Sequence, residues 1–175
     1  MEIILIRHTT PKVKKGICYG QSDIDTEESF EKEVLVIQSQ LQKINNNIFF
    51  YSSPLKRCRK LAEKLSKKIR FDDRLKELNF GDWELKKWDD IDKKILDIWM
   101  NDFVNIPPKN GESYIELFHR TSTFIKELKE EGIQKAVIVT HAGVIRSLHA
   151  FINETLLEDS FKLKIPYGAV IKLSF

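Results

Sequence analysis

The run Ile3-Ile4-Leu5-Ile6 constrains the fold of this chain more than any other stretch. Such an unbroken, β-prone apolar run is typical of a strand that is covered on both faces inside a mostly parallel sheet. Two further runs have the same character, at residues 48–51 and 136–140. Helical patterns lie between the three runs. We therefore predict an α/β fold built on a mostly parallel central sheet.

Cationic side chains follow each of these strands. Arg7 and His8 come directly after the first, Arg57 lies in the first turn of the helix after the second, and His141 follows the third. The carboxyl ends of parallel strands meet at one rim of a sheet, where ligands bind in open α/β folds. Two guanidinium groups and two imidazoles in one place suit a tetrahedral dianion and repel a metal cation. The pattern therefore predicts a phosphate pocket.

The chain uses arginine sparingly, which makes these positions more informative. Of its 29 basic residues, seven are arginines and the rest are lysines. A planar guanidinium holds two phosphate oxygens at once, and a lysine cannot imitate this. Ser52, Ser53 and Pro54 have the order of a helix start, so we expect a serine cap and Pro54 at the first helical position. Arg57 would then lie near free backbone N–H groups, a setting that favours an anion.

The remaining periodic segments complete the pattern of alternating elements. We expect helices over residues 30–44 (closed by the run Asn45-Asn46-Asn47), 88–99, 113–128 and 144–151, a short strand at 69–72, an edge strand at 167–173, and a long loop from Val13 to Asp25. The helix over 88–99 is expected to be amphipathic, with its apolar positions at Trp88, Ile91, Ile95, Ile98 and Trp99. No repeat or linker divides the chain, so 1–175 is interpreted as one domain.

Composition narrows the class of partner. The net charge of +3 is spread among nearly balanced acids and bases, which argues against a nucleic acid or a membrane surface as the main partner. No apolar run approaches a membrane span and no cleavable leader opens the sequence, so a cytoplasmic protein is expected. Cys18 and Cys58 are too far apart for a zinc knuckle or a redox dithiol. We expect no metal and no cofactor, and the oligomeric state stays open.

Several segments together resemble the histidine phosphatase superfamily, the phosphoglycerate-mutase-like group. They are Leu5-Ile6-Arg7-His8-Thr9, Ser52-Ser53-Pro54-Leu55-Lys56-Arg57-Cys58, Leu75-Lys76-Glu77-Leu78-Asn79-Phe80-Gly81-Asp82-Trp83-Glu84, Gly111-Glu112-Ser113 and Val139-Thr140-His141-Ala142-Gly143-Val144-Ile145-Arg146. Arg-His-Thr together with Cys18-Tyr19-Gly20-Gln21-Ser22-Asp23 is most similar to the α-ribazole phosphatases of cobalamin nucleotide-loop assembly. The resemblance implies a three-layer α/β/α sandwich and a metal-independent phosphomonoesterase.

The resemblance also implies a role for each matched residue. His8 would attack phosphorus as a neutral imidazole and form a phosphohistidine. Arg7, Arg57 and His141 would hold the phosphate oxygens. Glu77 would protonate the leaving alcohol and later deprotonate the attacking water. From the residues alone, Glu77 could not be chosen over Asp82 or Glu84. Tyr19 is a candidate contact to the leaving group.

Three positions depart from the family pattern. Thr9 replaces a usual glycine, Leu85 stands where many members carry glycine, and Asn110 occupies another position where glycine is frequent. The preferred substrate is a small, nucleotide-like phosphate ester such as α-ribazole 5′-phosphate. The alternatives are a phosphoglycerate mutase, a broad-specificity phosphatase, and a non-catalytic module that binds phosphorylated ligands.

Overall fold

The computed structural model describes residues 1–41 and 48–175. Within this part of the chain, strands form a sheet in the order β3-β2-β4-β1-β5. Their bounds are β1 (Glu2–Arg7), β2 (Phe49–Ser52), β3 (Ile69–Phe71), β4 (Lys135–Thr140) and β5 (Val170–Ser174). Neighbouring strands run parallel except at the edge, where β5 is antiparallel to β1. The predicted mostly parallel sheet is confirmed.

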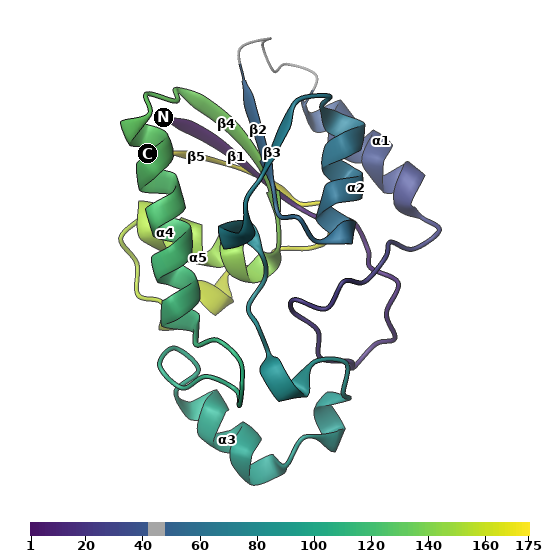
Figure 1. Ribbon diagram of the computed structural model, residues 1–175, viewed down its shortest axis with the longest axis vertical. Helices are drawn as coiled ribbons and strands as arrows, with labels where there is room; N and C mark the ends of the chain where they lie inside the picture. The colour runs from purple at the N-terminus through teal and green to yellow at the C-terminus, as the bar shows by residue number, and fades with distance from the viewer. Residues whose placement is uncertain (42–47) are drawn as a thin grey trace.

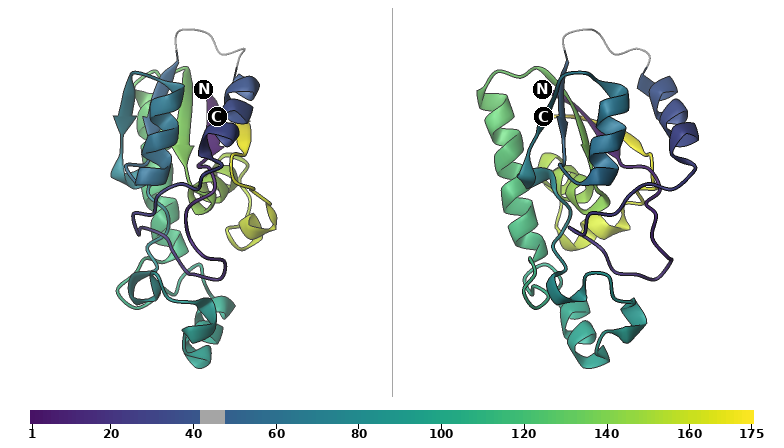
Figure 2. Two further views of the ribbon diagram at one scale, coloured as in Figure 1. Left: turned by 90° about the vertical axis from the view of Figure 1, so that its right-hand side faces the viewer. Right: turned by 45° about the vertical axis from the view of Figure 1, so that its right-hand side comes forward.

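Helices cover both faces of this sheet. The α-helices are α1 (Phe30–Leu41), α2 (Lys56–Leu65), α3 (Lys93–Asn101), α4 (Tyr114–Glu130) and α5 (Ala142–Ile152). In Figure 1 and in the right-hand view of Figure 2, α1 and α2 lie on one side of the strands and α4 lies on the other. The chain therefore forms the three-layer α/β/α sandwich that the resemblance implies.

The central strands explain the three layers. Ile3 to Ile6 are fully buried, and successive side chains of a strand point to opposite faces of the sheet. Ile4 and Ile6 pack in the cluster that contains α1 and α2 side chains, whereas Ile3 and Leu5 pack in the cluster that contains α4 and α5 side chains. Each fully buried side chain of this size contributes roughly 1.5–3 kcal/mol. The continuous apolar run is thus needed because both faces of the strand are covered.

Some element bounds differ from the predictions. Helix α2 begins at Lys56, after Leu55, and no side chain caps it, so the expected serine cap and the helical Pro54 are wrong. The Ser53 hydroxyl instead accepts from the N–H of Leu55 at 3.3 Å, in the turn just before the helix. Helix α1 is described to Leu41, and the predicted continuation to Ile44 and the run Asn45-Asn46-Asn47 lie outside the described residues.

The prediction for the helix over 88–99 is confirmed only in part, because Ile91 is buried but two other apolar positions are not. Residues Trp88–Asp90 form a short 3₁₀ turn, and α3 begins only after Asp92, whose carboxylate caps its first N–H groups. Ile95 and Ile98 are more than half exposed, although Trp99 is buried. The helical period was present, but this segment extends beyond the sheet and has no layer above it to cover that face (Figure 1).

Two of the departures from the family pattern have a backbone consequence. Leu85 has φ 64° and Asn110 has φ 59°, both in the left-handed region. Glycine adopts this region without strain, asparagine tolerates it, and a branched side chain such as leucine resists it. The glycines that are common at these positions are therefore explained by the local conformation.

Candidate active site

Two histidines meet where the central strands end. In the parallel register of β1 and β4, Arg7 lies opposite Thr140, so the next residue of each strand is a histidine. The N–H of His8 donates to the Thr140 carbonyl at 3.0 Å. The imidazole rings of His8 and His141 are both buried, with their centroids 5.1 Å apart. The structure thus brings together two residues that are 133 positions apart along the chain.

Arg57 joins the two imidazoles. It follows β2, the strand on the other side of β4, and it is fully buried in the first turn of α2. Its Nε donates to His8 Nε2 at 3.3 Å, and its Nη2 lies 3.1 Å from His141 Nδ1. The same guanidinium donates to the carbonyls of Ser22 (2.8 Å) and Gly20 (2.5 Å). Arg57 therefore holds the long loop after β1 against both histidines.

These contacts define which nitrogen of each imidazole carries the proton. His8 Nδ1 lies 2.7 Å from the Thr9 carbonyl, which can only accept, so Nδ1 carries the proton and Nε2 carries the lone pair. In His141, Nδ1 faces the Arg57 donor, so Nε2 carries the proton and donates to Ser53 Oγ at 2.8 Å. The Nε2 lone pair of His8 therefore points toward the guanidinium of Arg57, where an anion would be held.

The electrostatics of the pocket keep both imidazoles neutral. Burial lowers the pKa of His8 well below 6.5, and the positive charges of Arg57 and Arg7 lower it further, against an opposing hydrogen bond to the Thr9 carbonyl. Burial likewise lowers the pKa of His141 well below 6.5, followed by the charge of Arg57. A neutral imidazole, which keeps a lone pair on one ring nitrogen, is the form that can act as a nucleophile.

Arg7 and two tyrosines border the histidines. The Arg7 guanidinium lies 3.9 Å from the centre of the Tyr167 ring, and its Nη1 donates to the Ile165 carbonyl at 2.5 Å. The buried Nε of Arg7 has no hydrogen-bond partner among the described residues. Tyr167 also lies 5.6 Å from the His8 ring and shares a 2.7 Å O–H···O hydrogen bond with Tyr19. The Tyr19 ring in turn lies 5.4 Å from the Arg57 guanidinium.

Glu77 approaches the same end of the sheet from the loop after β3. Its carboxylate accepts from the N–H of Leu78 at 2.9 Å and from the N–H of Gly143, near the N-terminus of α5, at 3.1 Å. Gly143 allows this contact, because a Cβ there would lie 2.3 Å from Glu77 Oε1. Any larger side chain at position 143 would require the Glu77 carboxylate to move. The structure therefore places the Glu77 carboxylate at the backbone of Gly143, which follows His141 by two residues.

The geometry separates Glu77 from the two other candidate carboxylates. Glu84 accepts from the backbone N–H groups of residues 20, 21, 22 and 80 and from the hydroxyl of Ser22. Burial opposes ionisation of Glu84, but these hydrogen bonds outweigh it and hold its pKa below the usual carboxyl range. Asp82 bonds to Asn110 and faces Lys109 at the surface. Glu84 therefore organises the loop that Arg57 contacts, and Glu77 is the carboxylate beside the histidines.

Sequence reasoning missed several residues of this site. Ser53, expected as a helix cap, bonds to His141, and Tyr167, expected within an edge strand, precedes β5 and packs on Arg7. Cys58 is buried, and its Sγ lies 3.4 Å from His141 Nε2. Burial raises the pKa of Cys58 to about 12, so its thiol stays protonated at neutral pH and is no nucleophile. None of these contacts has a periodic signal in the sequence.

Other cationic residues lie apart from this cluster. Arg59 is exposed on α2, and Arg146 donates to the Leu163 carbonyl at 3.1 Å. His119 and His149 lie on α4 and α5. In the described ranges, no three His, Cys, Asp or Glu side chains are grouped so that they could hold a metal ion. No helix within residues 1–41 and 48–175 is long and apolar enough to cross a membrane.

Known proteins share both the sequence pattern and the fold. An adenosylcobalamin/α-ribazole phosphatase of Escherichia coli is 35% identical over 98 residues, covering 54% of this chain and 48% of the relative. A metal-independent phosphoserine phosphatase of Arabidopsis thaliana is 28% identical over 165 residues, covering 87% of this chain and 69% of the relative. The solved α-ribazole phosphatase of Shigella flexneri superposes with a TM-score of 0.90 at 24% identity, covering 99% and 90% of the two chains.

The family assignment rests on the match along nearly the whole chain. The similarity to the solved structure confirms the phosphoglycerate-mutase-like fold. The sequence model of the histidine phosphatase superfamily (branch 1) matches residues 3–175. That range contains every residue of the cluster described above. The chain therefore belongs to branch 1 of the histidine phosphatase superfamily.

Proposed function

We propose that this protein is a phosphomonoesterase that works through a phosphohistidine on His8 and needs no metal ion. The observation that carries the proposal is the protonation pattern of the buried histidines. Both imidazoles are neutral, and His8 turns an Nε2 lone pair toward the Arg57 guanidinium. Arg7, Arg57 and the donors around them favour a phosphate dianion there and oppose a divalent cation.

In the first step, His8 Nε2 forms a bond to phosphorus while the bond from phosphorus to the ester oxygen breaks. Arg7, Arg57 and His141 spread the negative charge that builds up on the other phosphate oxygens. The departing oxygen takes a proton from Glu77, because an alkoxide is a poor leaving group.

In the second step, water attacks the phosphohistidine and gives a proton to Glu77. The bond between phosphorus and Nε2 breaks, and inorganic phosphate leaves with the imidazole neutral again. The carboxylate is positioned for both steps by the backbone N–H groups of Leu78 and Gly143. Hydrolysis therefore needs only water and the ester.

The proposed substrate is a small, nucleotide-like ester such as α-ribazole 5′-phosphate. The Escherichia coli relative supports this choice, and so do the Tyr19 and Tyr167 rings that border the pocket and offer an apolar surface with a polar tip. Phosphoserine is the second candidate, which the Arabidopsis thaliana relative favours. A phosphoglycerate mutase would instead return an isomerised ester, and a binding module would release no phosphate.

The test measures phosphate release from a panel that holds α-ribazole 5′-phosphate, phosphoserine, 3-phosphoglycerate and 4-nitrophenyl phosphate. We expect hydrolysis that a chelator does not reduce and that His8→Ala abolishes. Activity that survives His8→Ala would refute the mechanism. Isomerised phosphoglycerate with little free phosphate would indicate the mutase, and binding of phosphate esters with no turnover across the panel would indicate a binding module.

A further inference from the structure

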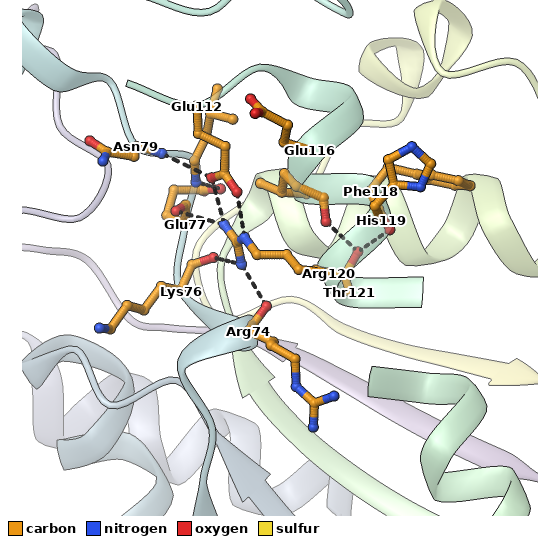
Figure 3. A network of polar contacts seen from close by, with 12 residues as sticks. Arg74, Lys76, Glu77, Asn79, Glu112, Glu116, Phe118, His119, Arg120 and Thr121 are labelled. Carbon is orange, nitrogen blue, oxygen red and sulfur yellow. Dashed lines mark hydrogen bonds and ion pairs between the residues drawn. The ribbon is translucent and has the colours of Figure 1, made fainter. Parts of the chain in front are cut away.

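Arg120, on α4, makes most of the side-chain contacts that hold the segment carrying Glu77. Gln21 Nε2 also donates to the Glu77 carbonyl at 3.0 Å, and Thr140 Oγ1 donates to the Leu75 carbonyl at 2.7 Å. Lys76 and Glu77 lie outside the helices and strands, so no regular ladder fixes their carbonyl groups. Arg120 Nη1 donates to the carbonyls of Arg74 (2.5 Å) and Lys76 (2.8 Å), and its Nη2 donates to the carbonyl of Glu77 at 3.1 Å. Figure 3 shows the guanidinium surrounded by these carbonyl oxygens.

Glu112 fixes Arg120 from the other side. Arg120 Nε donates to Glu112 Oε1 at 2.6 Å and its Nη2 donates to Oε2 at 2.9 Å, a two-pronged pair whose side chains are 18% and 15% exposed. The N–H of Glu112 donates to the carbonyl of Asn79 at 2.8 Å. The chain on both sides of Glu77 is therefore attached to the same pair of side chains (Figure 3).

Only arginine can make this set of contacts. A guanidinium presents five N–H groups in one rigid plane, and Arg120 uses Nε, Nη1 and Nη2 at once. The ammonium of lysine is a single point with three donors and cannot reach Glu112 and three carbonyls together. Only seven of the 29 basic residues of the chain are arginines, so its composition alone would favour lysine at position 120.

We propose that Arg120 is a positioning residue for proton transfer to the leaving group. It holds the backbone from residue 74 to residue 77 so that the Glu77 carboxylate stays at the N-terminus of α5, beside His141. This inference rests on the proposed role of Glu77. Arg120 makes no hydrogen bond to the imidazole of His8 or His141, so its hydrogen bonds act on the Glu77 carboxylate through the segment that they hold. Its positive charge also helps to lower the pKa of His141.

A positioning role has a chemical signature that a purely structural role lacks. An ester with a poor leaving group, such as 2-phenylethyl phosphate, needs the proton from Glu77, whereas 2,4-dinitrophenyl phosphate does not. The value of kcat/KM reports the steps up to and including transfer of the phosphoryl group to His8. It therefore shows how strongly the leaving group depends on the proton from Glu77, without a contribution from the later hydrolysis of the phosphohistidine. A misplaced carboxyl group should lower kcat/KM for the first ester and spare the second.

The experiment measures kcat/KM for both esters in the wild-type protein and in Arg120→Gln, Arg120→Lys, Glu112→Gln and Glu77→Gln. For Arg120→Gln we expect a loss of about 100-fold with 2-phenylethyl phosphate and of less than about threefold with 2,4-dinitrophenyl phosphate. Arg120→Lys and Glu112→Gln should show the same selective loss to a smaller degree. Adding Arg120→Gln to Glu77→Gln should cost little more, because the two changes act on one step.

Lys129→Gln is the matched control. Lys129 is a cationic residue of the same helix, α4, but its ammonium lies 3.9 Å from the centre of the Phe175 ring and makes none of the hydrogen bonds that hold residues 74–77. We expect its ratio of the two kcat/KM values to equal that of the wild type. If Arg120→Gln does not fold, as judged by thermal unfolding, Arg120→Lys and Glu112→Gln decide the question.

Equal losses with both esters in every folded Arg120 and Glu112 variant would overturn the inference, and so would full additivity with Glu77→Gln. Failure of the proposed function would look different. In that case Glu77→Gln would itself show no preference between the esters, or His8→Ala would keep hydrolysing them.

Discussion

Replacing Gly143 by alanine tests the placement of the Glu77 carboxylate. The added Cβ would lie 2.3 Å from Glu77 Oε1, whereas an ordinary contact begins near 3.4 Å, so the oxygen must withdraw by about 1 Å. The change should also break the 3.1 Å hydrogen bond from the Gly143 N–H. Displacement of this size from a reacting position costs on the order of 100-fold in rate, or about 2.7 kcal/mol.

The substitution should leave the fold intact, so that a change in kcat/KM can be assigned to the active site and not to unfolding. Gly143 lies in the first turn of α5, where alanine is favoured over glycine by up to about 1 kcal/mol, so this gain offsets the lost hydrogen bond. We expect a melting temperature within a few degrees of the wild type and a loss of about 100-fold in kcat/KM for 2-phenylethyl phosphate. For 2,4-dinitrophenyl phosphate we expect a loss of less than about threefold.

Either of two results would refute this reasoning. Wild-type kcat/KM with the alkyl ester would mean that the Glu77 carboxylate does not act from its position beside Gly143. Equal losses with both esters would mean that the methyl group acts on the phosphate pocket through His141 instead. Phosphate inhibition constants separate this second case, because they should stay unchanged if only the carboxylate moves.

Three further predictions concern the same molecule. Arg57→Lys should lower kcat for 4-nitrophenyl phosphate by roughly 100-fold or more, because a lysine cannot contact both imidazoles and both loop carbonyls; retention of a tenth of the activity would contradict this. Leu85→Gly should raise the free energy of unfolding by roughly 0.5–1 kcal/mol in urea titrations, since it relieves a left-handed leucine that is largely exposed. Below pH 6.5 His141 is protonated in the unfolded chain but stays neutral in the buried site. The free energy of unfolding should therefore fall as the pH falls, by up to about 1.4 kcal/mol per pH unit for this ring, and His141→Gln should reduce that slope. Equal slopes for His141→Gln and the wild type between pH 7 and pH 5 would refute the last.

The arrangement of the strand ends could be predicted from the sequence because it follows from few rules. Buried strands that alternate with helices pair in parallel, and parallel strands deliver the residues after their last apolar position to one rim. Arg7 is the last residue of β1, His8 and His141 directly follow β1 and β4, and Arg57 lies in the first turn of the helix after β2. Their convergence therefore depended on strand order and direction and not on any side-chain detail.

The residues that support the site could not be found in this way. Arg120, Ser53 and Glu84 act through backbone carbonyls, backbone N–H groups or a neighbouring side chain in loops, and such contacts leave no period in the sequence. Arg120 lies on α4, a helix that the sequence predicts. The helical pattern, however, indicates only that Arg120 is not on the buried face of that helix. The exposure of Ile95 and Ile98 has the same origin, because periodicity predicts a helix but does not say what covers it.

The most direct test of the account asks where the phosphoryl group resides during turnover. Rapid mixing with 2,4-dinitrophenyl phosphate, quenching in base and peptide mass spectrometry should detect an acid-labile phosphate on His8, with none on His141 and none at all in His8→Ala. A phosphorylated residue other than His8, or turnover at the wild-type rate with no phosphorylated protein at any mixing time, would contradict the central claim.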